Sequence, residues 1–200
     1  MKKYFKIILL AFSFFIFSFS WAGVSPLAVS LVPPLEFPPA DFTVTGARLS
    51  VLWGHQRNFY GVDLGLGGNI TDLEYKGLAI SGLFNNTRGT TTILGLQLAG
   101  IANINESKTH VYGLQVALGA NYNESESTVS GLQIALLTNL SAFTDIYGAQ
   151  IGLYNRAKDV YGLQIGLVNV AESLHGIQIG LLNFNHKGTF VVSPILNAGF

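Results

Sequence analysis

The sequence contains no cysteine and only 11% charged residues, and each shortage narrows the classes of protein to which it can belong. Without cysteine there is no disulfide framework and no acylation site of the lipoprotein kind. Lys2, Lys3 and Lys6 account for three of the eleven basic residues, so residues 23–200 carry eight basic against eleven acidic residues, a net charge of −3. This part of the chain has no basic cluster, so we expect no nucleic-acid partner.

The motifs of familiar active sites are also missing. The four histidines show neither HxH nor HExxH spacing, and no GxSxG nucleophile motif occurs. The many Gly-x-Gly pairs belong to a repeat and lack the strand-to-helix context that a phosphate-binding loop needs. We therefore expect a protein that is not an enzyme, with no cofactor and no metal site.

The segment Met1–Ala22 has the pattern of an export signal. A basic start is followed by an uncharged apolar stretch over 7–20, and Ser20-Trp21-Ala22 forms a small-x-small cleavage site before Gly23. The alternative is an N-terminal membrane anchor, but the apolar stretch is short for one. We expect an exported protein of the outer membrane or cell surface, with the periplasm or secretion as the alternative.

Residues 41–200 are built from copies of one phrase, clearest as VYGLQIGLVN at Val160–Asn169. Nine glycines mark the units at similar but unequal spacings: Gly46, Gly61, Gly77, Gly95, Gly113, Gly131, Gly148, Gly162 and Gly176. A short repeat of this kind determines the architecture. Residues 23–40 form a proline-rich lead that we expect to be a linker or an edge cover rather than a strand, because proline removes ladder donors.

Each unit alternates like a strand. Leu163, Ile165 and Leu167 fall on one face, whereas Gln164 and the glycines beside it fall on the other. Ile177, Ile179 and Leu181 repeat the apolar face, which we interpret as core in a soluble fold or as lipid-facing in a membrane barrel. Asn closes nearly every unit, and we attribute this to its tolerance of a left-handed backbone and to its side chain bonding its own turn.

Two all-β architectures accommodate such units. The favoured one is an antiparallel array of about nine or ten strands curled into a shallow barrel or ring of hairpins, because the segments between units are of hairpin length. The alternative is a parallel β-solenoid with one unit per coil. The shortest units, such as the one from Gly148 to Gly162, leave little chain for two walls and their corners, which counts against the solenoid.

One polar level crosses the units and supplies the candidate binding residues. Units one and two place Arg48 and Asp63 at this level, where neighbouring strands in register would form a cross-strand ion pair. Six later units place glutamine there: Gln97, Gln115, Gln133, Gln150, Gln164 and Gln178. The first interpretation is a self-satisfying amide ladder, and the second is a constriction or ligand floor facing a lumen.

Tyrosine precedes the anchor glycine in four units, at Tyr60, Tyr112, Tyr147 and Tyr161. One interpretation is an aromatic belt at a membrane interface. The other is a set of stacked aromatic side chains on a soluble sheet. A membrane or lipid is therefore the partner class that the sequence leaves open, while protein partners stay unknown.

The GLQIGLVN phrase, the FPPxD entry and the closing NFNxxG…PILNxxF resemble bacterial exported surface-repeat proteins over about residues 33–200. This resemblance implies a shallow, closed antiparallel barrel of radiating hairpins, called a β-flower. It implies an exported envelope protein and supplies no catalytic residues. The expected function is a non-enzymatic envelope or surface role in structure or binding, and the alternative is an integral outer-membrane β-barrel with a small or closed lumen.

Overall fold

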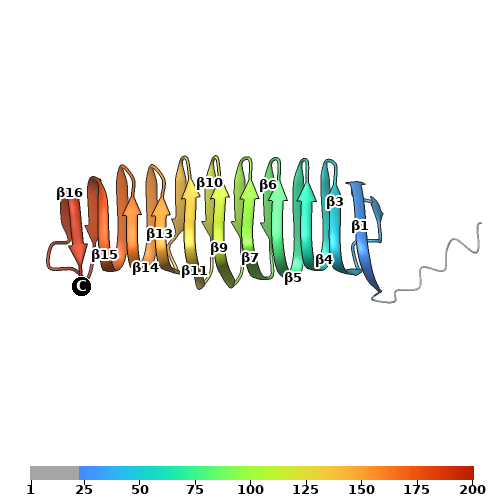
Figure 1. Cartoon of the computed structure of the whole chain (residues 1–200), viewed down its shortest axis with the longest axis horizontal. Helices are drawn as coiled ribbons and strands as arrows, with labels where there is room; N and C mark the ends of the chain where they lie inside the picture. Colours follow the sequence, from blue (N-terminus) through green and yellow to red (C-terminus); the bar gives the residue numbers. More distant parts are fainter. Residues whose placement is uncertain (1–22) are drawn as a thin grey trace, which may run out of the picture.

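A computed structural model describes residues 23–200, and these residues form an elongated stack of parallel β-coils with no helix (Figure 1). The strands of the N-terminal half are β1 (Val24–Val32), β2 (Leu35–Phe37), β3 (Thr43–Ser50), β4 (Trp53–Gly65), β5 (Gly68–Ser81), β6 (Phe84–Thr87), β7 (Thr90–Ala99) and β8 (Ala102–Asn105). Those of the C-terminal half are β9 (Thr109–Ala117), β10 (Ala120–Asn123), β11 (Ser127–Ala135), β12 (Thr138–Ser141), β13 (Thr144–Ile151), β14 (Tyr154–Ile165), β15 (Val168–Asn185) and β16 (Val192–Gly199).

Each coil contributes a long strand to one wall and a short strand to the other. In the middle of the stack the two are separate, as in β9 and β10 or β11 and β12, whereas β14 and β15 each run through both walls. Both walls are parallel and in register, so that Gly113 pairs with Gly131 and Asn121 pairs with Asn139. Equivalent residues of successive units therefore stack directly on one another.

The favoured antiparallel barrel is wrong, and the parallel solenoid that was its alternative is the observed fold. Each unit crosses both walls rather than one, and even the shortest coils close: from Gly148 to Gly162 the chain needs one turn at Gly152–Leu153 and a corner within β14. Parallel stacking in register also places each glutamine and each asparagine on its own copy, which an antiparallel arrangement does not do. The predicted export signal lies outside the described residues.

The anchor glycines allow the coils to approach closely. All nine have positive φ, from 96° to 154°. A Cβ added at Gly131 would lie 2.1 Å from the carbonyl oxygen of Gly113 in the coil before it. Glycine is required there both by the backbone conformation and by the contact between coils.

Irregular strands cover both ends of the stack. The proline-rich lead forms β1, which pairs in parallel with β3, so the expectation that its prolines exclude a strand is wrong. At the other end β16 pairs antiparallel with β15 and contains Pro194 followed by Ile195, whose φ is 68°. Such ends present a poor template for the stacking of another chain.

The space between the two walls is filled by side chains of both kinds. One apolar stack runs along the inside of the long wall and consists of Val44, Phe59, Tyr75, Ile93, Val111, Val129, Ile146, Val160 and Leu174. The rest of the interior is occupied mainly by amides, hydroxyls and alanines. Among residues 23–200, no helix of the length and hydropathy that a membrane span requires is found.

Candidate functional site

The polar level predicted from the sequence lies inside the solenoid. Arg48 and Asp63 are paired in register on β3 and β4, and both side chains are fully buried. Arg48 Nε donates to Asp63 Oδ1 at 2.8 Å, and Arg48 Nη2 donates to Asp63 Oδ2. The remaining amino group donates to the carbonyl of Ile70 at 3.0 Å, and the guanidinium lies 5.0 Å from the ring centroid of Phe59. The predicted cross-strand pair is thus present in a parallel sheet.

Burial changes the titration of this cluster. It raises the pKa of the Asp63 carboxyl, against the opposing effect of Arg48. Burial alone would lower the pKa of Arg48, but the adjacent carboxylate outweighs it and the pKa is raised. Burial, together with Asp63, also raises the pKa of Tyr75 well above its ordinary value. These shifts belong to groups enclosed among coils, where an ion pair holds the chain in register.

The six glutamines of the polar level form one continuous hydrogen-bonded ladder. From Gln178 to Gln115, each Nε2 donates to the Oε1 of the glutamine in the preceding coil at 2.6 to 2.8 Å, and Gln97, the first of the six, donates to Asn105 Oδ1 at 3.1 Å. At the C-terminal end Asn197 of β16 donates to Gln178 Oε1 at 3.3 Å. All six side chains are fully buried. The amide-ladder interpretation describes this arrangement, and no face of the ladder is open to a ligand.

A second ladder, which the sequence did not predict, runs along the short wall with the opposite direction of donation. The amide of Asn103 donates to Asn121 Oδ1 in the following coil at 2.9 Å, and also to the carbonyl of Val116 at 2.8 Å. The same two bonds recur at Asn121 and Asn139. The asparagines lie on strands and none has positive φ, so the left-handed part of the explanation is wrong. The expected bond to the preceding turn is present at Asn155, which donates to Gly152 O at 3.1 Å, and at Asn183, which donates to Gly180 O at 3.0 Å.

The polarity of the solenoid is consequently inverted along much of its length. Amides fill the inside, whereas the leucines and isoleucines of the repeat phrase point outward. Ile177 is 44% exposed and Leu181 is 66% exposed, so the interpretation of this face as a soluble core is wrong. The physical reason is that stacked glutamines pair with their own copies and can therefore be enclosed without losing hydrogen bonds, and the alternate residues of each strand then lie on the outer surface.

Apolar residues concentrate along one side of the stack, in the turns that lead from each long strand to the following short strand, the last of these being an irregularity within β15 between Gly180 and Asn183. We call this side the apolar edge. In nine successive coils it is formed by exposed aliphatic side chains: Leu52, Leu66, Leu83, Ile101, Leu118, Leu136, Leu153, Leu167 and Leu181. None of these nine turns contains a charged residue.

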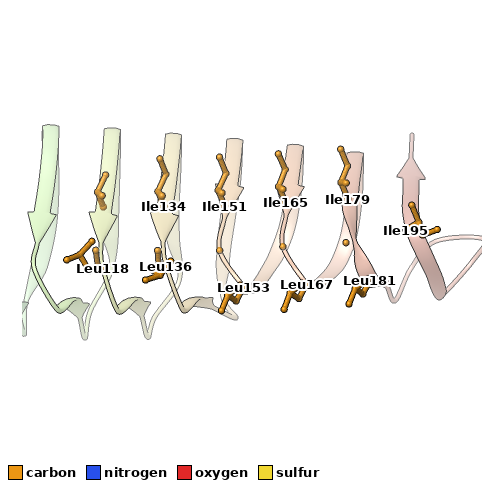
Figure 2. Close-up of a pocket in the computed structure, with 16 residues that line it drawn as sticks. Leu118, Ile134, Leu136, Ile151, Leu153, Ile165, Leu167, Ile179, Leu181 and Ile195 are labelled. Atoms are coloured by element: carbon orange, nitrogen blue, oxygen red, sulfur yellow. The ribbon is translucent and has the colours of Figure 1, made fainter.

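A groove runs along the apolar edge over the C-terminal coils (Figure 2). Its volume is about 720 Å³, and its lining is almost entirely apolar. Isoleucines at the ends of the long strands, such as Ile134 and Ile165, form one row, and turn leucines such as Leu136 and Leu167 form the other (Figure 2). Alanine and glycine lie between the two rows. The groove therefore offers a binding partner a hydrocarbon surface with few polar groups.

Aromatic side chains limit the apolar surface on the long wall. Tyr147, Tyr161 and His175 stack in successive coils, with ring centroids 4.8 Å and 4.6 Å apart. They point outward like Ile165 but lie nearer to the other side of the stack. On the short wall the exposed Arg156 lies two residues beyond Tyr154. The predicted tyrosine stacking is thus present at Tyr147 and Tyr161, on the outer surface.

The opposite turns are polar, and we call this side the polar edge. Asp72 there accepts from Arg88 Nη1 at 2.9 Å and contacts His55 Nε2 at 2.7 Å. Lys187 pairs with Glu172 at 2.7 Å farther along. The side chains of residues 23–200 include no group of three or more histidine, aspartate or glutamate residues placed to hold a metal ion.

Comparisons with family models, with curated proteins and with solved structures find no match for this chain. The apolar edge was not predicted, although the sequence contains a signal for it. A leucine or isoleucine follows a small residue at the turn of nearly every unit, as in IGL, IAL and LAGI, whereas surface turns are usually polar.

Proposed function

We propose that the protein is a non-enzymatic, exported component of the outer membrane or cell surface that binds an apolar surface through its apolar edge. The observation that carries this proposal is the inverted polarity of the solenoid. The amide ladders are enclosed, whereas nine successive turns present leucine or isoleucine to the outside. The export signal expected over Met1–Ala22 supports the assignment to the envelope.

The size of the apolar edge favours a binding role over an incidental patch. Coils of a parallel stack are spaced by about 4.8 Å, so nine turns extend over roughly 40 Å. Continuous exposed apolar surfaces of this kind mark interaction or membrane sites in soluble proteins. Covering the row of leucines releases water from each of them, and this supplies a favourable free energy of binding without any charge.

The buried polar groups support a structural role for the interior. Arg48 and Asp63 satisfy each other, and the glutamines satisfy one another from coil to coil. Such networks fix the register of the coils and make the stack a rigid support. A rigid, straight support is suited to presenting a linear apolar surface.

Cell fractionation tests the proposed function. The full chain, expressed in a diderm bacterium, should be found in the envelope fraction after the cells are broken. A variant with Leu136→Ser and Leu167→Ser should move to the soluble fraction, because both side chains lie on the apolar edge and neither is part of the interior. Protease treatment of intact cells then distinguishes a surface location from a periplasmic one. Recovery of the parent protein in the cytosol would refute the proposal.

A further inference from the structure

The apolar edge and the row of aromatic side chains lie at a defined separation along the long strand. Ile165 lines the groove beside the apolar edge, and Tyr161 lies four residues before it, which corresponds to about 13 Å along an extended strand. On the short wall, Leu153 and the exposed Arg156 are three residues apart, or about 10 Å. The long wall beside the apolar edge is thus apolar to a depth of roughly 10–15 Å, whereas the short wall is mixed, with Thr138 and Tyr154 next to the edge and Arg156 about 10 Å from it.

This depth matches one leaflet of a bilayer. The hydrocarbon core is about 30 Å thick, so each leaflet contributes about 15 Å. Tyrosine prefers the level of the headgroups, and arginine near an apolar surface reaches its guanidinium toward the same level. We infer, building on the proposed function, that the apolar edge inserts into one leaflet of a lipid bilayer, with the Tyr147–Tyr161–His175 row and Arg156 at the headgroups.

Two features favour a bilayer over a bound peptide or a single lipid. The lining of the groove is almost entirely apolar, so an extended peptide would leave its own backbone groups without partners. The apolar edge also extends beyond the groove, through Leu52 and Leu66 in the first coils. A bilayer covers the whole edge and both sides of the groove at once, whereas one acyl chain would leave the outer side of each leucine in water.

Electrostatics adds little to this interaction. Residues 23–200 carry a net charge of −3, and the nine turns of the apolar edge carry none. Binding should therefore occur on vesicles of neutral phosphatidylcholine. It should also persist in about 1 M salt, where the Debye length falls to about 3 Å. These two properties distinguish insertion of hydrocarbon from attraction to anionic headgroups.

Flotation with vesicles of pure phosphatidylcholine tests the inference. The parent chain should float with the vesicles at both low and high salt. The variant Leu136→Ser with Leu167→Ser should partition at least about tenfold more weakly, because it removes two exposed leucines from the apolar edge. The matched control, Leu73→Ser with Phe143→Ser, removes apolar side chains of similar exposure from the polar edge and should float like the parent.

Tryptophan fluorescence supplies a second measurement. The sequence has two tryptophans, so Trp21→Phe leaves Trp53, which follows the first turn of the apolar edge and is 40% exposed. Its emission should shift to the blue on vesicle binding, and acyl-chain bromination of the lipid should quench it. Both responses report insertion of the edge itself, and adsorption through the N-terminal segment would produce neither.

The outcomes separate this inference from the proposed function. Equal flotation of the parent and both double variants, or an unchanged Trp53 spectrum, would overturn insertion of the apolar edge. The other informative outcome is that the parent fails to float with vesicles, while the Leu136→Ser, Leu167→Ser variant still leaves the envelope fraction. That result would indicate a protein partner for the apolar edge, and the proposed function would stand. Because all four substituted positions are exposed, the variants should unfold at the same temperature as the parent.

Discussion

Replacing the buried ion pair by the glutamine pair of the later coils offers a direct test of the ladder. Arg48 and Asp63 occupy the level that Gln97 and Gln115 occupy farther along, where the amides bond at 2.8 Å. The single variant Arg48→Gln leaves the Asp63 carboxylate enclosed without its cation. The single variant Asp63→Gln leaves the Arg48 guanidinium enclosed without its carboxylate. Each should lower the free energy of unfolding by about 3–5 kcal/mol.

The double variant should behave differently, because it installs a neutral pair whose amides satisfy each other. We expect it to lie within about 1 kcal/mol of the parent, since a net amide hydrogen bond contributes on this scale. The two single losses would add to roughly 6–10 kcal/mol, so the cycle should show a large favourable coupling.

Denaturant unfolding followed by the fluorescence of Trp53 is the suitable assay. Trp53 belongs to the same coil as Arg48, and stacked repeats unfold in terms of neighbouring units. Trp21→Phe in every variant removes the other source of signal. Additive effects of the two single changes would mean that the side chains do not meet, and the proposed register of the first coils would be refuted.

Three further changes separate the inside of the stack from its surface. Gln133→Leu should lower stability by about 2–4 kcal/mol in denaturant unfolding, because it interrupts the ladder and leaves buried amides unpaired; a loss below about 0.5 kcal/mol would contradict an enclosed ladder. The Ile165 side chain points outward, so Ile165→Asp should fold with a melting temperature near that of the parent and should lose vesicle binding. Failure of this variant to fold would place this face in the core. Gly131→Ala should cost more than Gly95→Ala in thermal melts, because only the added Cβ at Gly131 meets a backbone oxygen; equal costs would show that conformation alone requires these glycines.

The sequence by itself determined the class of structure and much of its register. Alternation around Gln164 predicts strands, and the repeat of Gly-x-Gln predicts that equal positions meet, which places Arg48 opposite Asp63. The alternation is a local property of each unit, and it holds whether neighbouring strands run parallel or antiparallel. Hydrophobic periodicity therefore could not decide between the barrel and the solenoid.

Only the tertiary structure decided which face is inside. Period-two alternation identifies two faces but assigns neither to the interior, and the usual preference for burying leucine gives the wrong answer here. The two narrow walls enclose the side that can form hydrogen bonds from coil to coil, namely Gln133 and Asn121 with their copies. Leu136 and Leu167 are left outside in consequence. The amides can be enclosed because each pairs with its own copy in the next coil, and this pairing follows from stacking that no single unit contains.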